Sequence, residues 1–299
     1  MKILSIFTLL VAFAIAPSLA QDLDDLLNSM ESETIDYTTA TFKSSRVINL
    51  HSPERVAPGA MEFRISHRFG PLNGGAYNLW GLDQSSVRFG FDFGLTKWLM
   101  VGVGRSTYEK TYDGFVKAAI LRQSTGKKVM PLSAVWVSNM SVNGLRWEFP
   151  DRTNYFSSRI AFVHQLVLAR KFSDRFSAEV VPTWVHFNLV EGTADLNYIP
   201  AIGFGGRIKL SRRTALNGEY ILRVADKNAP NVANYNDSFS IGFDIETGGH
   251  VFQLHLTNSL AMMEKGFIAE NTDTWGNGGI HFGFNVTREF TLSKKSRME

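Results

Sequence analysis

A two-residue alternation of apolar and polar side chains runs through most of this sequence from Gly59 onward. Between residues 87 and 96, Val, Phe and Leu alternate with Arg, Gly, Asp and Thr. Residues 239–246 and 280–287 repeat the arrangement, with Phe, Ile and Val on one side and mostly small or polar residues on the other. Successive side chains of a β-strand point to opposite faces. The alternation therefore predicts an all-β chain whose strands each have an apolar face and a polar, glycine-rich face.

The boundaries of the alternating runs predict twelve strands joined as consecutive hairpins. They span 11–16 residues each: 59–72, 85–96, 98–110, 114–124, 130–143, 157–172, 176–190, 198–211, 214–225, 237–249, 250–262 and 278–292. Residues 40–50 are predicted to add a further extended piece. Strands of this length exceed the usual ~5–6 residues of soluble sheets and suit the roughly 10 residues that cross a bilayer at a tilt.

An even strand number, with short turns at one end and long loops at the other, is typical of outer-membrane barrels. The fold expected is a closed antiparallel up-and-down transmembrane β-barrel of about 12 strands. A soluble β-sandwich with the apolar faces turned inward is the alternative. Arg105 shares the parity of the apolar residues, so it lies either at the membrane interface or inward through a bulge near Gly104.

The first residues read as an export signal. Lys2 precedes an apolar run over residues 3–16, and the small residues Ser18 and Ala20 follow it. This pattern predicts a cleaved signal peptide over 1–20. The expected organisation is then a periplasmic acidic arm or plug over 21–58, which begins with a short helix, a transmembrane β-barrel over 59–292, and a periplasmic basic tail over 293–299.

Charge is divided unevenly along the chain. The net charge of +3 is too small to indicate nucleic-acid binding. Six acidic residues lie between Asp22 and Asp36, and without Lys2 and this stretch the remainder has 30 basic and 22 acidic residues, a net charge of +8. The acidic arm and the basic body could attract each other, or the arm could be a solvated tail. The absence of cysteine excludes disulfides and thiol chemistry.

Sequence motifs for catalysis or cofactor binding are missing. None of the seven histidines stands in an HExxH or similar metal-ligand spacing, and there is no GxSxG nucleophile elbow. The glycine runs at 101–104 and 203–206 lack the Lys-Ser/Thr of a phosphate loop. We therefore expect no catalytic residue, no metal site and no cofactor. A membrane-embedded hydrolase would need a Ser or Asp beside a His at one rim.

The polar faces of the predicted strands would form the barrel lumen. They carry charges of both signs, which are the candidate selectivity residues: Glu62, Arg64, Arg68, Arg88, Asp92, Arg207, Lys209, Glu219, Arg223, Asp244 and Glu246. His186 and His255 are assigned to the same face. Abundant glycine on this face favours open space and the long Arg and Lys side chains favour filling. Twelve strands lie between the number found in barrels filled by side chains and the number found in water-conducting barrels. The strand number therefore does not decide between a filled and an open lumen.

Several segments also carry a family resemblance. They are TATFKSSRVINLHS (39–52), FRISHRFG (63–70), LWGLDQSSVRFG (79–90), VGVGRSTYEKTYDG (101–114), LRQSTGKKVMPLS (121–133), RTNYFSSR (152–159) and GRIKL (206–210). They resemble an uncharacterised family of outer-membrane β-barrel proteins of unknown function, found in Bacteroidota-type Gram-negative bacteria. The resemblance covers nearly all of the mature chain. It implies a barrel in the outer membrane and brings no substrate or catalytic residue.

The function expected is an outer-membrane β-barrel that acts as a passive or substrate-selective channel for small polar solutes through its charged lumen. The main alternative is a non-channel structural or docking barrel, and the hydrolase ranks last. The expected partners are outer-membrane lipid, a small polar solute and a periplasmic protein bound through residues 21–58. Nucleic acid is not an expected partner.

Overall fold

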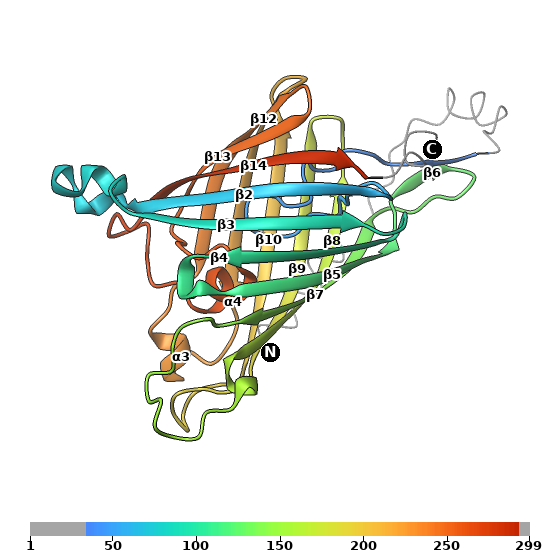
Figure 1. Cartoon of the computed structure of the whole chain (residues 1–299). Coiled ribbons are helices and arrows are strands. Elements are labelled where there is room, and N and C mark those ends of the chain that lie inside the picture. Colours follow the sequence, from blue (N-terminus) through green and yellow to red (C-terminus); the bar gives the residue numbers. More distant parts are fainter. Residues whose placement is uncertain (1–33, 293–299) are drawn as a thin grey trace, which may run out of the picture.

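The computed structural model, which describes residues 34–292, is built around twelve antiparallel strands that close into a barrel (Figure 1). Each strand pairs with its neighbour in the chain, and β14 pairs with β2 to complete the wall. The strands are β2 (Ala60–Pro71), β3 (Ser85–Gly94), β4 (Leu99–Ser106), β5 (Tyr112–Leu121), β7 (Ser133–Val142), β8 (Ile160–Lys171), β9 (Phe176–Phe187), β10 (Tyr198–Lys209), β11 (Thr214–Arg223), β12 (Ser238–Thr247), β13 (His250–Thr257) and β14 (His281–Thr291).

The predicted barrel, its strand number and its hairpin order are confirmed. The strands are shorter than predicted, at 8–12 residues. Among these, β13 ends at Thr257 because the next residues turn into the barrel interior and become buried. The predicted signal peptide, the arm residues 21–33 and the basic tail 293–299 lie outside the described residues.

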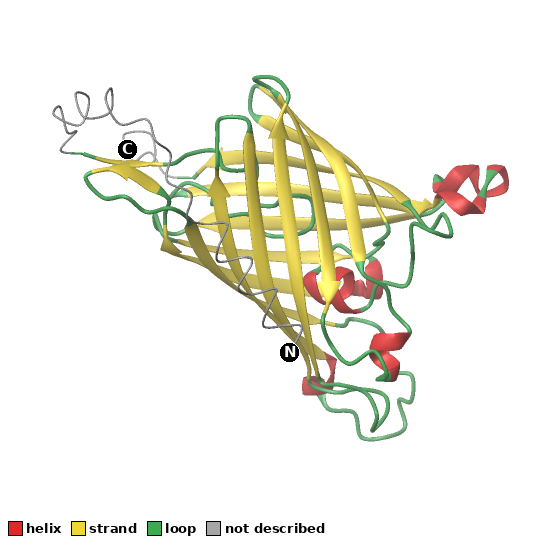
Figure 2. Cartoon of the chain, turned by 180° about the vertical axis from the view of Figure 1, so that it is seen from behind, coloured by secondary structure: helices red, strands yellow, loops and turns green. Residues whose placement is uncertain are grey.

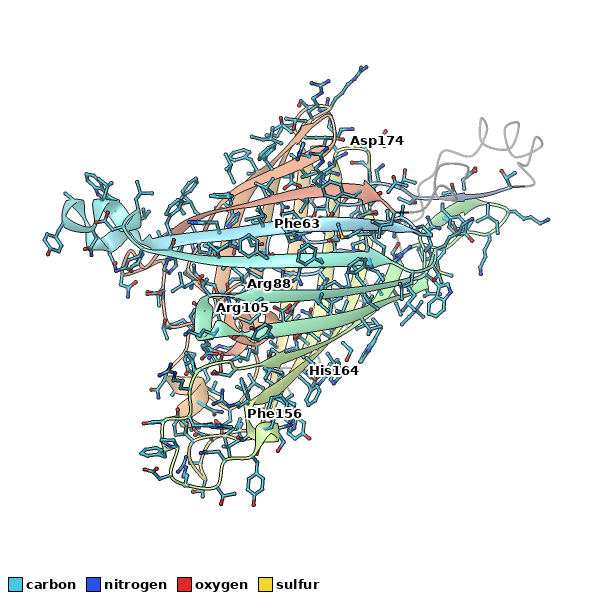
Figure 3. The ribbon with its side chains drawn as sticks, in the orientation of Figure 1. Phe63, Arg88, Arg105, Phe156, His164 and Asp174 are labelled. Carbon is cyan, nitrogen blue, oxygen red and sulfur yellow. The ribbon has the colours of Figure 1, made fainter. Side chains whose placement is uncertain are left out.

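The two ends of the barrel differ. Most connections at one end are short turns, and the helices described within residues 34–292 lie in the connections at the other end (Figure 2). These helices are η1 (Leu72–Gly74), η2 (Ala76–Gly81), η3 (Tyr108–Lys110), η4 (Phe156–Arg159), α3 (Pro230–Ala233) and α4 (Glu264–Ala269). Asp174 in a short turn and Phe156 in a long loop mark the two ends in Figure 3.

A second, two-stranded sheet lies beside the barrel at the short-turn end. It pairs β1 (Ile35–Tyr37) with β6 (Ser124–Gly126). Within residues 34–292, no helix combines the length and the apolar character that a membrane crossing requires.

The apolar face of each strand points outward. Phe91, Phe243 and Leu254 are exposed there, whereas the alternating polar residues are buried. Arg105 is also outward, near the end of β4, with its guanidinium 5.4 Å from the ring centre of Tyr112. The β3–β4 ladder runs through Arg105 without a register shift, so the bulge near Gly104 is wrong.

The outward position of Phe91 generates a prediction about how the cost of a charge depends on its depth in the bilayer. A Phe91→Arg substitution, in the middle of β3, should destabilise the barrel in lipid by about 2–4 kcal/mol, because the charge enters hydrocarbon. Leu95→Arg, at the adjoining turn and 53% exposed, should cost about 0–1 kcal/mol. Urea titration of refolding into lipid vesicles measures both changes. Equal costs for the two variants would contradict a membrane-facing role for this surface.

Candidate functional site: the barrel lumen

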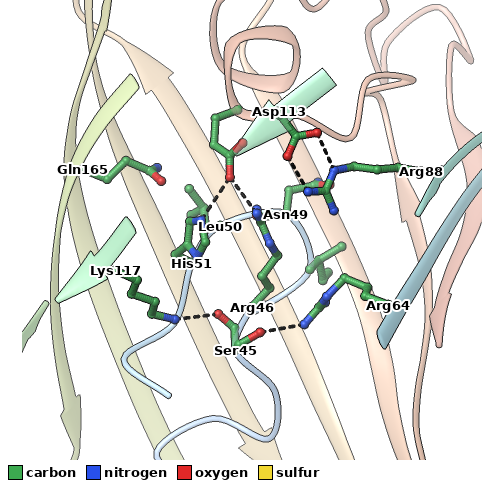
Figure 4. A network of polar contacts seen from close by, with 12 residues as sticks. Ser45, Arg46, Asn49, Leu50, His51, Arg64, Arg88, Asp113, Lys117 and Gln165 are labelled. Atoms are coloured by element: carbon green, nitrogen blue, oxygen red, sulfur yellow. Dashed lines mark hydrogen bonds and ion pairs between the residues drawn. The ribbon is translucent and has the colours of Figure 1, made fainter. Parts of the chain in front are cut away.

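Residues 41–56, here called the lumen loop, fold back on themselves inside the barrel (Figure 4). The amide of Thr41 donates to Glu54 Oε1 at 2.8 Å, which brings the two ends of the loop together. Further along, the amide of Ser52 donates to the Ser45 carbonyl at 3.1 Å, and that of Val47 to the Leu50 carbonyl at 2.8 Å. Residues 44–52 are all buried. The loop therefore enters and leaves at the short-turn end, with residues 47–50 at its tip.

The tip of the loop is held by one carboxylate, that of Glu219 on β11. Its Oε2 accepts the backbone amides of Ile48, Asn49 and Leu50 at 3.2, 2.9 and 3.0 Å. Its Oε1 accepts the side-chain amide of Asn49 at 2.7 Å. Hydrogen bonds to a charged group contribute roughly 1.5–3 kcal/mol each. Glu219 is therefore the strongest single polar attachment of the loop.

Basic side chains of the wall bind other parts of the loop. Arg64 donates to the hydroxyls of Ser44 and Ser45, both at 2.8 Å. Lys117 on β5 donates to the carbonyl oxygens of Ser45 and Glu54 at 3.0 and 2.6 Å. Arg68 donates to Asn49 Oδ1 at 2.9 Å. Side chains of both charges thus satisfy backbone and polar groups of the loop that would otherwise be buried without partners.

Apolar residues also line part of the lumen. The loop residues Phe42, Val47 and Val56 share a buried cluster with wall residues, and Leu50 belongs to a second cluster. The wall residues come mainly from β7–β11, among them Val135, Val137, Val163, Val167, Val181, Val185, Ile199 and Ile221. This explains why the segment 157–172 is apolar on both faces: its inner face packs against protein and not against water.

A second segment fills the lumen from the long-loop end. Residues 258–271, here called the loop-end insert, contain α4 and are almost entirely buried. Glu264 of the insert forms an ion pair with Arg46, at 2.7 Å between Oε1 and Nη2, and contacts His51 Nε2 at 3.0 Å. The three side chains are at most 5% exposed. The two inserted segments therefore meet through one buried ionic contact.

The loop-end insert is also fixed to the rim. Lys265 forms ion pairs with Glu109 in η3 and with Glu270, both at 2.7 Å. Burial would lower the pKa of Lys265, but the two carboxylates outweigh it and raise that pKa, so the amine stays charged. The ion pairs hold the insert against the β4–β5 connection.

The structure places all eleven predicted lumen residues on the inner face or at its rim, and most of them are buried. Six contact the chain segment 40–56 directly: Glu62, Arg64, Arg68, Arg207, Glu219 and Glu246. Asp244 reaches it through Gln253, whose amide donates to both Asp244 and the Val47 carbonyl.

The other four predicted residues have different surroundings. Arg88 forms a two-point ion pair with Asp113, at 2.9 and 2.5 Å. Arg223 holds the β11–β12 connection through Asp237 and the carbonyls of Val232 and Tyr235. Asp92 is buried, and Lys209 lies at the short-turn mouth.

Sequence reasoning missed several residues that bind the loop. Lys117, Gln253 and Asn285 have the parity of the polar face, and that parity was the available signal. Arg46 and Glu264 had no such signal, because neither belongs to a barrel strand. The assignment of His186 to the lumen is wrong. Its ring lies outward, with its centre 4.4 Å from that of the tilted Tyr198 ring, while Val185 and Thr183 point inward. His255 does point inward.

Glycine on the inner face does not create open space. A Cβ at Gly203 would lie 2.9 Å from Leu50 of the lumen loop. At Gly94, one would lie 2.1 Å from the carbonyl oxygen of Ala57 as the chain leaves the lumen. The expectation that lumen glycine favours an empty pore is wrong, because the inserted segment approaches the wall closely at these positions.

A histidine at the rim has both ring nitrogens engaged. His281 contacts Asp273 at 3.1 Å and the Phe69 carbonyl at 2.8 Å, so both ring nitrogens already face an oxygen. Neither nitrogen is left to activate a nucleophile. Ser138 and His164 are 3.0 Å apart on the outward face of the wall. Among residues 34–292, no cluster of three or more His, Asp or Glu side chains could hold a metal ion.

The family comparison agrees with the fold. The family model described as "Membrane bound beta barrel domain (DUF5777)" matches residues 42–290. No protein of curated function matches the sequence at a significant level. Among solved structures, the NanC porin aligns with a TM-score of 0.48 and 8% identity, over 78% of this chain and 100% of that one. The COG4313 outer membrane channel from Pseudomonas putida F1 aligns with a TM-score of 0.42 and 12% identity, over 80% and 98%.

The Glu219 contacts generate a second prediction. Glu219→Gln should release the tip of the lumen loop, because the amide presents donors to backbone groups that are themselves donors. With a loss of about 3 kcal/mol, hydrogen exchange of amides 48–50 should accelerate roughly a hundredfold.

A matched control is available on the neighbouring inner face. Glu179 on β9 is equally buried and has no hydrogen-bond partner within the described chain. Glu179→Gln should therefore leave the exchange of amides 48–50 unchanged. Similar acceleration in both variants would show that Glu219 does not hold the loop specifically.

Proposed function

The chain belongs to the family of membrane-bound β-barrel domains, and from this premise we propose that it is an outer-membrane channel for small polar solutes, closed by the lumen loop. The layout of short turns at one end and long loops at the other is that of bacterial outer-membrane barrels, in which the short turns face the periplasm. A cleaved signal peptide over residues 1–20 would deliver the chain there. The lumen loop then enters from the periplasmic side.

The observation that carries the proposal is the way the loop is attached. Its contacts with the wall are made by wall side chains, such as Glu219 and Lys117, and not by the strand ladders. One isolated bridge, Pro58 to Gly94, joins the chain to a wall strand where it leaves the lumen. Withdrawal of the loop therefore leaves every strand of the barrel paired, and no backbone group of the wall is exposed to lipid.

With the loop-end insert displaced as well, withdrawal of the lumen loop would leave a lumen suited to polar solutes. The side chains that bind the loop through its carbonyl, amide and hydroxyl groups can bind water or solute through the same hydrogen bonds. Rings and clusters of fixed charge set the selectivity of such a passage. The mechanism is passive, with no covalent step and no cofactor.

A structural or docking barrel without a channel is the second candidate. It is favoured by burial of the lumen, since Lys117, Gln165 and Glu264 have no exposed surface. In that case residues 21–58 would serve a periplasmic partner and the lumen loop would be a permanent core.

Conductance of a crosslinked variant separates the two candidates. The side chains of Asn49 and Ser240 are 3.2 Å apart, and the chain contains no cysteine of its own. Asn49→Cys with Ser240→Cys can therefore be joined by a short, reducible thiol crosslinker that fixes the loop to β12. In planar bilayers, the crosslinked protein should conduct at least tenfold less than the same variant before crosslinking, and reduction should restore conductance.

Each single cysteine variant, treated with the same reagent, is the control and should keep its conductance. Absence of conductance in all forms, including the wild type, would refute the channel and favour the structural barrel. Equal conductance with and without the crosslink would show that the lumen loop does not close the passage.

A further inference from the structure

A small cavity lies at the short-turn mouth of the barrel, where the chain enters the lumen. Its volume is about 80 Å³, several times the roughly 10–15 Å³ that one water requires. The turn after β10 supplies much of its lining through Arg212 and Arg213, and the end of β10 supplies Arg207 and Lys209. Lys43 and Lys171 complete the basic lining, and three acidic residues, Asp174, Asp244 and Glu246, also contribute.

The acidic residues of this cavity are already engaged. Glu246 pairs with Lys43 at 2.6 Å, and Asp174 pairs with Lys171 at 3.3 Å. Asp244 accepts the side-chain amide of Gln253 at 2.9 Å. Two of the six cations are neutralised by these ion pairs, and the charge of Asp244 offsets a third. The excess positive charge of the lining therefore comes from the four basic residues of the β10–β11 hairpin.

None of these four residues forms an ion pair within residues 34–292, although the carboxylates of Asp244 and Glu246 lie near Arg207. In the part of the chain that the structure describes, the side chains of Lys209, Arg212 and Arg213 make no hydrogen bond or ion pair. Arg207 is only 8% exposed, yet it bonds merely to the backbone carbonyls of Ala40 and Thr41, at 3.1 and 3.5 Å. Its Nε, buried beside the cavity, has no partner. A buried guanidinium with a free donor is costly unless an acceptor occupies the adjacent space.

We propose that this cavity binds the anionic group, a carboxylate or a phosphate, of a small solute. Guanidinium forks bind both groups through two parallel hydrogen bonds, and three arginines converge on the cavity. If the bound group belongs to a transported solute, the site rests on the proposed channel function. The solutes of the channel would then be anions. The Ser-Arg-Arg-Thr turn at 211–214 then has a role beyond closing a hairpin.

The same chemistry could come from the chain itself. The six acidic residues between Asp22 and Asp36 precede the segment that lines the cavity. A carboxylate of this stretch would compete with a soluble anion for the same donors. A variant in which all six of these residues are replaced by their amides distinguishes the two sources.

The test is titration calorimetry of the mature, detergent-solubilised protein with inorganic phosphate and with acetate. If a soluble anion is the ligand, the wild type should bind phosphate or acetate saturably. If the acidic stretch occupies the site, only the amide variant should do so. In the form that binds, Arg212→Gln with Arg213→Gln should raise the dissociation constant at least tenfold. Both arginines are exposed in a turn, so the barrel should fold, as its heat-dependent mobility in gels can verify.

Lys127→Gln with Lys128→Gln is the matched control. It removes the same charge from exposed positions in the connection between β6 and β7 that do not line the cavity. This control should bind as the parent does. No saturable binding in either the wild type or the amide variant would overturn the proposal, and so would equal weakening by both double substitutions. Anion binding without any bilayer conductance would retain the site and refute the channel.

Discussion

Closure of the sheet is the constraint on which the rest of the structure depends. The β14–β2 ladder joins the last strand to the first, so each barrel strand is paired on both sides. In hydrocarbon an unpaired backbone group costs several kcal/mol, and closure removes both edges at once. It also encloses an interior from which bulk water can be excluded. Whether the barrel can conduct solutes depends on what occupies that interior.

Two segments from opposite ends occupy it, and the wall is adapted to them. Glu219, Arg64 and Lys117 bind the backbone and hydroxyl groups of the lumen loop. Valine and isoleucine of β7–β11 pack in the same buried clusters as Phe42 and Leu50. The lumen wall thus combines polar attachments with apolar packing surfaces. A wall that faced only water would gain nothing from these apolar residues.

The wall could be predicted from the sequence because a strand in a barrel repeats every second residue. Phe89 and Phe91 alternate with Arg88 and Asp92, and this local pattern fixes which side each residue faces. The filled lumen could not be predicted in the same way. The contacts of Asn49 with Glu219 and Ser240 join residues 170 or more positions apart, and no periodicity relates them.

Particular residues show where the limit lies. The doubly apolar segment 157–172 and the apolar residues Val47, Ile48 and Leu50 were both visible in the sequence. The burial of each is explained only by its packing inside the closed barrel. His186 was misassigned because its neighbours alone do not settle the parity near a strand end. Glu264 belongs to a long connection whose path depends on the closed barrel around it.

The position of the lumen loop in the chain has a consequence for biogenesis. The loop precedes all twelve strands, yet its tip is bound by β11, β13 and β14. Contacts of such high sequence separation form late, because most of the chain must first be ordered. The lumen loop therefore reaches its final position only after β11, β13 and β14 have formed, and the wall is assembled around it. Pairing of β14 with β2 and binding of the lumen loop then form one cooperative step. The machinery that inserts this barrel must therefore accommodate the lumen loop inside the sheet while the sheet is still forming.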